Sequence, residues 1–273
     1  MPSYVITGVS RGLGYEFLRQ LSSDPKDIVI GTVRDKAAAL KKVSEDADLK
    51  GRSNIHLLEV ELTNYEALKR AAAEVAKITG GSLDYLIANA AHVSQFDAYD
   101  PIGVLGTEKP QELESDLKQA FDINVISNIH LYNLFMPLIL KGQTKKVVVI
   151  STGMAEMDLV NKYEVDMSPL YSISKAAMNM VTAKFNAQYK KDGVLFLSIS
   201  PGVVDVGKYT DLTPHQMESM GSMMQKFAQY APHFTGPLTP AESARAVRSV
   251  WEKATAQENG GDFISHLGNK QWL

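Results

Sequence analysis

Short aliphatic runs recur along the chain, and a segment long enough for a helix follows most of them. Each run is apolar at successive positions, so both faces of the strand it predicts would be buried. Buried strands separated by helix-length segments favour a parallel sheet covered by helices over an antiparallel sandwich. The predicted strands are residues 4–7, 28–32, 55–60, 85–88, 146–151, 195–200 and 263–265.

Between the predicted strands, apolar residues recur three or four positions apart, as on helices that pack against a sheet. Helices are predicted over residues 15–22, 65–79, 112–140, 172–191 and 240–256. Together these elements indicate an α/β fold, a doubly wound parallel β-sheet flanked by helices in a three-layer αβα arrangement of Rossmann type. A single domain of this kind is expected to span residues 1–273.

Residues 206–239 interrupt the rhythm and are rich in Met, Gly and Pro. Their apolar side chains would suit a cap over a bulky substrate, because methionine adapts its shape to its partner. The same side chains at helical spacing would also serve ordinary packing. The segment is therefore predicted to be a substrate-binding excursion, with packing as the open alternative.

The composition narrows the class of protein and its partners. With 45% hydrophobic and 22% charged residues, the 273-residue chain is expected to be globular. A net charge of −3 argues against a nucleic-acid partner, which clustered Lys and Arg would attract. The chain has no cysteine, so disulfides and thiolate metal sites are excluded, and no metal is expected. No apolar run reaches transmembrane length, and the first strand is predicted almost at Met1; a cytoplasmic protein without a membrane partner is expected.

A glycine-rich segment, residues 7–14, lies directly between the first predicted strand and the first predicted helix. In this position Gly8 and Gly12 would let the backbone turn tightly around a pyrophosphate, and Gly14 would let helix and strand pack closely. The start of the helix then faces the anion. A glycine-rich surface turn is the alternative, because short glycine patterns recur by chance.

Tyr171 and Lys175 lie four positions apart in a predicted helix, so both side chains can reach one ligand. A free tyrosine has a pKa near 10, and a nearby ammonium favours the phenolate and lowers that pKa toward the working range of an enzyme. Taken alone, the pair would also suit a packed ring and a solvated amine.

The order of these motifs resembles that of the short-chain dehydrogenase/reductase family, in its carbonyl-reductase-like branch. The glycine segment has the spacing TGxxxGxG, the Tyr-x-x-x-Lys pair follows the fifth strand, and Pro201-Gly202 follows the sixth. The resemblance extends over essentially the whole chain. It implies an oxidoreductase that transfers a hydride between a nicotinamide cofactor and a carbonyl or alcohol substrate.

The resemblance also implies the roles of the catalytic residues. Tyr171 would be the general acid in reduction, and Lys175 would lower its pKa and hold the nicotinamide ribose. Asn124 would support a water in the proton relay. Relatives use the second of two hydroxyls at the end of the fifth strand to bind the substrate oxygen, which favours Thr152, although Ser151 stays open.

An acidic residue that would bind the ribose of NAD is absent from the tip of the second strand, and Arg34 stands there. Arg34 and Arg11 would suit the 2′-phosphate of NADPH/NADP+ through charge-assisted hydrogen bonds. Asp35 could partly offset either charge, and both arginines could be ordinary solvated side chains. NADPH is the expected cofactor.

Further residues are assigned to the cofactor by the same resemblance. Glu61 and Leu62 would hold the adenine, and the turn Asn89-Ala90-Ala91 would brace the sheet and border the ribose. The remaining cofactor-binding candidates are Ser10, Leu13, Gly202, Val204 and Pro201.

The expected substrate is an apolar ketone or aldehyde, with polycyclic and aromatic compounds as candidates, by similarity of residues 261–272 to the ends of carbonyl reductases. His92 is a candidate for the pocket wall, although a structural or solvated role is the more ordinary interpretation. An inserted segment, residues 153–169, could also border the substrate. A homodimer or homotetramer is left open. Two rival hypotheses are a non-redox cyclase or isomerase on this fold and a dinucleotide-sensing binding protein.

Overall fold

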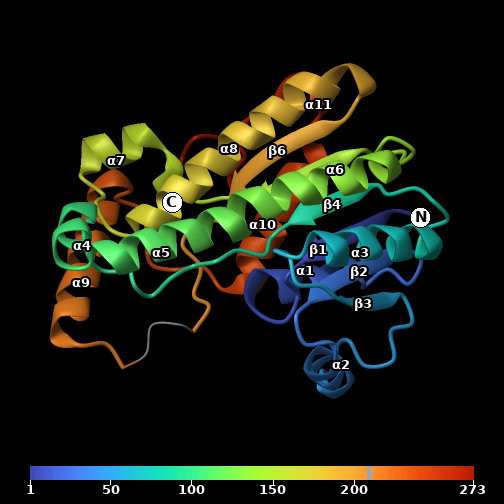
Figure 1. The fold of residues 1–273 in the computed structure, drawn as a ribbon, viewed down its shortest axis with the longest axis horizontal. Helices are drawn as coiled ribbons and strands as arrows, with labels where there is room; N and C mark the ends of the chain where they lie inside the picture. Colours follow the sequence, from blue (N-terminus) through green and yellow to red (C-terminus); the bar gives the residue numbers. More distant parts are fainter. Residues whose placement is uncertain (208–210) are drawn as a thin grey trace.

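Seven parallel strands form one sheet in the order β3-β2-β1-β4-β5-β6-β7 in the computed structural model (Figure 1). The structure describes residues 1–207 and 211–273. The strands are β1 (Ser3–Thr7), β2 (Ile28–Val33), β3 (Ile55–Glu59), β4 (Tyr85–Ala88), β5 (Lys146–Ile150), β6 (Leu195–Ser200) and β7 (Phe263–Ser265). The predicted fold class is confirmed, and every predicted strand matches to within one residue at each end.

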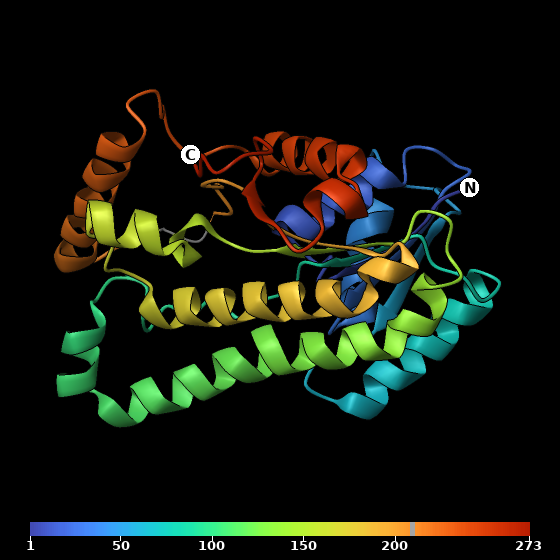
Figure 2. The same cartoon turned by 90° about the horizontal axis from the view of Figure 1, so that it is seen from above.

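Successive side chains of the strands enter two different cores, because they point to opposite faces of the sheet. In β1, Tyr4 and Ile6 pack with α1 (Gly12–Leu21) and α10 (Pro240–Lys253). Val5, between them, packs in the opposite core with α3 (Tyr65–Ile78) and α6 (Ser127–Ile139). Figure 2 shows these two helical layers on either side of the sheet. Burial on both faces explains why the strands lack polar alternation.

The remaining helices differ in length and location. They are α2 (Lys36–Glu45), α3 (Tyr65–Ile78), α4 (Ile102–Glu108), α5 (Pro110–Phe121), α6 (Ser127–Ile139), α7 (Met157–Tyr163), α8 (Pro169–Tyr189), α9 (Pro214–Tyr230) and α11 (Ala256–Asn259). A π-helical turn, η1 (Asp122–Ile126), joins α5 to α6, so the single helix predicted over 112–140 is three consecutive elements. Within the described residues, no helix is both long and apolar enough to cross a membrane.

A third apolar cluster lies apart from the two main cores and joins α7, α9 and the C-terminal residues. In Figures 1 and 2, α4, α7 and α9 gather at one end of the molecule. Much of the apolar set in the predicted excursion packs here, including Met223, Met224, Phe227 and Tyr230, whereas Met217 is exposed. Residues 208–210 of the excursion lie outside the described residues. Ordinary packing, the alternative to a cap over the substrate, therefore accounts for the positions of these four side chains.

Candidate active site

The glycine loop is held against the sheet by backbone contacts. The N–H groups of Gly8 and Val9 both donate to the carbonyl of Thr32 in β2, at 3.0 and 3.1 Å. Gly8 has φ +74°, a conformation that side chains disfavour. A Cβ on Gly14 would lie 2.2 Å from the carbonyl oxygen of Gly8, so only glycine fits at this approach of helix and loop. These contacts fix the conformation of the loop between β1 and α1.

The start of α1 is suited to an anion. Its N-cap residue, Arg11, is extended and makes no capping hydrogen bond with its side chain. The first N–H groups of a helix have no partners within the helix, and they carry a partial positive charge. A phosphate at this end of α1 would accept hydrogen bonds from them.

Asn89, at the end of β4, connects this loop to the centre of the sheet. Its side-chain amide donates to the carbonyls of Thr7 and Gly8, at 3.0 and 3.2 Å. The hydroxyl of Thr7 in turn accepts from the backbone N–H groups of Asn89 and Ala90. The bracing contacts implied for Asn89 by the family resemblance are thus present in the structure.

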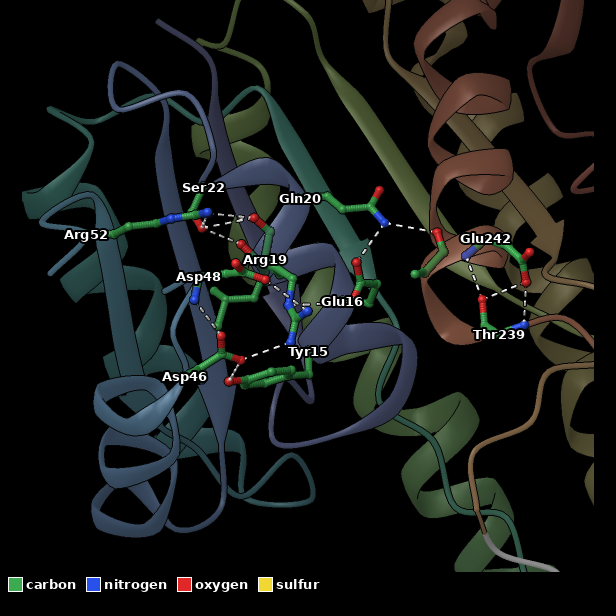
Figure 3. A network of polar contacts seen from close by, with 12 residues as sticks. Tyr15, Glu16, Arg19, Gln20, Ser22, Asp46, Asp48, Arg52, Thr239 and Glu242 are labelled. Atoms are coloured by element: carbon green, nitrogen blue, oxygen red, sulfur yellow. Dashed lines mark hydrogen bonds and ion pairs between the residues drawn. The ribbon is translucent and has the colours of Figure 1, made fainter. Parts of the chain in front are cut away.

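Helix α1 is fixed by polar contacts that the sequence does not reveal (Figure 3). Asp46, which follows α2, accepts from the phenol of Tyr15 at 2.7 Å and from the guanidinium of Arg19 at 2.9 Å. Lys42 of α2 lies over the ring of Tyr15, and its ammonium donates to the carbonyl of Ser10 at 2.9 Å. Lys42 thereby places a positive charge beside the glycine loop. No local motif marks Lys42, because its position depends on how α2 packs on α1.

Arg11 and Arg34 are exposed at the mouth of the same region. Across residues 1–207 and 211–273, neither guanidinium makes an ion pair with a carboxylate. Asp35, which could have offset their charge, instead caps α2 by accepting from the N–H of Ala38 at 2.9 Å. Both arginines are therefore positioned to meet an anionic group of a ligand.

Tyr171 and Lys175 lie one turn apart near the start of α8, as their spacing predicts. The Lys175 side chain is buried at 2% exposure, and its ammonium donates to the carbonyl of Ile150 at 2.7 Å. The ammonium nitrogen lies 5.7 Å from the centre of the Tyr171 ring. Burial lowers the pKa of Lys175 to about 8, since desolvation disfavours the charged form. A positive charge this close favours the phenolate form of the tyrosine.

The two hydroxyls after β5 have different surroundings. The Ser151 hydroxyl is buried and donates to the side-chain carbonyl of Asn179 in α8, at 2.8 Å. The Thr152 hydroxyl accepts from the N–H of Met154 at 3.3 Å, which occupies a lone pair and not its proton. The proton of Ser151 is thus engaged within the protein, and this difference favours Thr152 for binding a substrate oxygen.

Asn124 is fully buried within the π-helical turn, a kind of local distortion that is frequent at functional sites. Its side-chain oxygen accepts from the N–H of His92 at 2.7 Å. Its amide nitrogen donates to the carbonyl of His92 and to the hydroxyl of Ser174, at 3.0 and 2.9 Å. Ser174 then donates to the carbonyl of Tyr171 at 2.7 Å. Asn124 therefore links the loop after β4 to the helix that carries the tyrosine.

The glycine loop and the Tyr171 end of α8 border one cleft of about 440 Å³, a size typical of small-molecule sites. Most predicted site residues line it: Gly8, Ser10, Arg11, Gly12, Leu13, Gly14, Arg34, Glu61, Leu62, Asn89, Ala90, Ser151, Tyr171, Lys175 and Pro201. His92 lines it as well, with its ring 3.1 Å from a carboxylate oxygen of Asp116. His92 is thus part of the cleft wall and is not simply solvated.

Four predicted residues are outside the lining of this cleft: Asn124, Thr152, Gly202 and Val204. Gly202 packs so closely on His266 that a Cβ would lie 2.8 Å from the imidazole, and Val204 forms a β-bridge with Leu238. Their proposed contacts with the cofactor stay predictions. The cleft is also lined by residues that the sequence did not assign to the site, namely Thr32, Val33, Val60, Val93, Gln119, Ile123, Ile150 and Val206.

Comparisons with known proteins agree with this architecture. The short chain dehydrogenase family model matches residues 3–217. The short chain dehydrogenase virK of Hypocrea virens is 60% identical over 274 residues, and the short-chain dehydrogenase/reductase iacC of Pestalotiopsis fici is 50% identical over 275 residues; both alignments cover 100% of each chain. The NADPH-bound carbonyl reductase from chicken fatty liver has the same fold, with a TM-score of 0.71 and 21% identity over 98% of each chain. The chain therefore belongs to the short-chain dehydrogenase/reductase family and is an oxidoreductase of that family.

Proposed function

We propose that this enzyme uses NADPH to reduce the carbonyl group of an apolar small molecule to an alcohol. The observation that carries the proposal is the position of Tyr171 and the buried Lys175 on the same cleft as the glycine loop. The cleft thus holds a dinucleotide-binding end and a proton-transfer end together. Aromatic or polycyclic ketones and aldehydes are the substrate class to test first.

The residues at the catalytic end divide the work of reduction. Bound NADPH supplies the hydride. The Tyr171 phenol donates a proton to the carbonyl oxygen, and the Thr152 hydroxyl donates a hydrogen bond to the same oxygen. The positive charge of Lys175 stabilises the phenolate left after proton transfer. Asn124 and Ser174 hold the backbone of Tyr171 in place for this step.

The dinucleotide end fits a cofactor that carries a 2′-phosphate. Arg11 and Arg34 would bind this phosphate, with the charge of Lys42 nearby. Glu61 and Leu62 line the adenine side of the cleft in this assignment. The start of α1, which lacks a side-chain cap, would accept the pyrophosphate.

Binding and turnover together test this function. NADPH and NADH would be titrated by intrinsic fluorescence, and loss of nicotinamide absorbance would then be followed with a panel of hydrophobic ketones and aldehydes. Tight NADPH binding with turnover supports the reductase. Binding without turnover on any carbonyl would favour a non-redox enzyme or a dinucleotide sensor, and absence of binding would refute the assignment of the glycine loop.

A double substitution tests the catalytic residues directly. Tyr171→Phe with Lys175→Ala is expected to lower kcat by about 10²- to 10⁴-fold, because the proton donor and its supporting charge are lost. Circular dichroism should show an intact fold. An unchanged rate would contradict the catalytic assignment.

Arg34→Ala tests the preference for NADPH. Loss of a charge-assisted hydrogen bond worth about 1.5 to 3 kcal/mol should raise the Kd for NADPH by at least about 10-fold and leave the Kd for NADH unchanged. Arg70→Ala, at an exposed arginine of α3, is the matched control. Equal effects on the two cofactors would argue against a 2′-phosphate contact.

A further inference from the structure

A buried carboxylate lies against the first turn of the catalytic helix. Asp97 is 1% exposed, in the loop between β4 and α4. One of its carboxylate oxygens accepts from the backbone N–H groups of Leu170 and Tyr171, at 2.8 and 3.0 Å. Its backbone carbonyl also accepts from the N–H of Ser168 at 3.0 Å. Asp97 therefore accepts from three backbone N–H groups at or next to the start of α8, although it precedes all three residues by more than 70 positions.

Helix α8 has no cap of its own. Its N-cap residue, Ser168, is left-handed with φ +51° and makes no capping hydrogen bond with its side chain. Pro169 at the first helical position has no N–H group. Leu170 and Tyr171 follow it, and N–H groups in this turn are the ones that a capping side chain normally satisfies. The carboxylate of Asp97, which lies outside the helix, accepts these hydrogen bonds instead. It lies at the N-terminal end of α8, where the helix dipole favours a negative charge.

The same loop is fixed at its other end beside the cleft. Asn124 bonds both backbone polar groups of His92, and His92 lines the cleft. Through Ser174, Asn124 also reaches the carbonyl of Tyr171. The peptide groups of Tyr171 are thus held on two sides, by Asp97 at the N–H and by Ser174 at the carbonyl.

The charge of Asp97 and of its neighbours affects how readily the Tyr171 phenol loses its proton. Burial raises the pKa of the Asp97 carboxyl, and its hydrogen bonds to the N–H groups of Tyr171 and Leu170 act in the opposite direction. Asp116 on α5 is a second acid that raises this pKa, and Asp116 is itself paired with His92. A negative charge next to Tyr171 disfavours its phenolate, in opposition to Lys175 on the same helix.

We propose that Asp97 is a positioning residue for the reaction, whose carboxylate fixes the start of α8 and thereby sets the position and the proton affinity of the Tyr171 phenol. This inference rests on the proposed reductase function. Asp97 acts on Tyr171, through the backbone by its hydrogen bonds and on the phenol by its charge, and not on the substrate.

Two substitutions separate the geometric effect from the effect of charge. Asp97→Ala removes the acceptor and leaves two helical N–H groups without a partner. Asp97→Asn keeps an acceptor of nearly the same size and removes the charge. The matched control is Asp84→Asn, because Asp84 is also buried and its carboxylate accepts from backbone N–H groups, including those of Ser3 and Gln143 at 3.0 and 2.9 Å. Asp84 immediately precedes β4, at the end of the sheet opposite to the catalytic site.

The measurements are kcat, KM, the Kd for NADPH, the melting temperature and the pH profile of kcat for the most active carbonyl substrate. Asp97→Ala should lower kcat by about 10- to 100-fold with little change in the Kd for NADPH, because a small displacement of the proton donor is costly. Asp97→Asn should move the basic limb of the pH profile to lower pH, since the phenol loses its proton more readily without the neighbouring charge. Asp84→Asn should lower the melting temperature alone.

A purely structural cap would give a different result. If Asp97→Asn changes only the melting temperature, as Asp84→Asn should, the positioning role is refuted even where Asp97→Ala fails to fold. If the unsubstituted enzyme binds NADPH but reduces no carbonyl, the proposed function fails first, and this inference fails with it. An active parent enzyme with unaffected Asp97→Asn kinetics overturns this inference alone.

Discussion

Lys175 combines a buried position with a charge that the reaction needs. Its ammonium has one protein acceptor among the described residues, the carbonyl of Ile150, at 2.7 Å. Burial lowers its pKa to about 8 from an ordinary value of 10.5. The folded protein without ligand therefore binds this proton less strongly than the unfolded chain does, and the charge opposes folding at neutral pH.

This difference predicts how stability changes with pH. Between pH 8 and 10.5 the unfolded chain keeps a proton on Lys175 that the folded protein has released, so folding becomes more favourable as pH rises. Relative to Lys175→Met, the cofactor-free parent should gain roughly 2 kcal/mol in free energy of unfolding between pH 7.5 and 10. Urea unfolding of both proteins across this range measures it. A constant difference would show that Lys175 is not desolvated.

The hydroxyls after β5 give a second prediction at the scale of single residues. Thr152→Val should lower kcat by about 10-fold or more, because a hydrogen bond to the reacting oxygen is lost. Ser151→Ala removes the bond to Asn179 and should cost about 1 kcal/mol of stability with a smaller effect on kcat. Steady-state kinetics and thermal melts of the two variants distinguish the roles. The reverse pattern would assign the substrate oxygen to Ser151.

At the scale of elements, the C-terminal residues join the segments that follow the catalytic strands. Trp272 is 3% exposed and stacks on Phe263 of β7 with ring centres 4.3 Å apart. It contacts Gly153, directly after Thr152, so closely that a Cβ there would lie 2.7 Å away. The phenol of Tyr230 in α9 accepts from the backbone N–H of Trp272 at 3.0 Å, and the Trp272 side chain belongs to the same apolar cluster as Phe227 of α9. The position of α9 beside the turn at Gly153 thus depends on Trp272.

Trp272→Ala should therefore loosen this end of the molecule. The expected loss is about 3 to 5 kcal/mol of stability for a buried tryptophan, with a higher KM for the carbonyl substrate and an unchanged Kd for NADPH. Urea unfolding, substrate kinetics and limited proteolysis of α9 measure these effects. Met157→Ala, at a methionine that is 74% exposed on α7, is the control and should change none of them. Weaker NADPH binding in Trp272→Ala would show that the two ends of the cleft are not independent.

At the scale of the whole molecule, the cofactor cleft draws on both halves of the sheet. Its walls include the loops after β1, β2, β3 and β4 and residues of α8 and of the segment after β6. This arrangement follows from the parallel topology, which brings the carboxyl ends of all strands to one edge. A ligand bound there contacts segments that only the folded chain brings together.

NADPH should therefore stabilise the entire fold. At a concentration of 100 times its Kd, binding to the folded state alone contributes about 2.7 kcal/mol, which corresponds to a rise in Tm of roughly 5 °C or more. Differential scanning fluorimetry with NADPH and with NADH at equal concentration measures the effect. The shift with NADH should be smaller, and Arg34→Ala should reduce the difference. Equal shifts with both cofactors would contradict the proposed preference.

The seven strands, the glycine loop and the Tyr171–Lys175 pair could be predicted from the sequence because each depends on neighbours close along the chain. Apolar runs define buried strands, and a spacing of four places two side chains on one helical face. The sequence does not predict helices α2, α4, α7, α9 and α11. In α2, for example, Ala39 is the only fully buried residue and Val43 packs partly on the same core, so the apolar stripe is too narrow to predict the helix.

The sequence by itself thus determined the fold class, the order of the strands along the chain and the residues of the two ends of the cleft. Only the tertiary structure decided that Asp97 holds the start of α8, that Asn124 bonds His92, and that Trp272 packs on Gly153. These contacts join residues far apart in the chain, and they form only where loops from different strands meet. No local periodicity or spacing in the sequence predicts these contacts, because they depend on how the packed helices and strands bring the loops together.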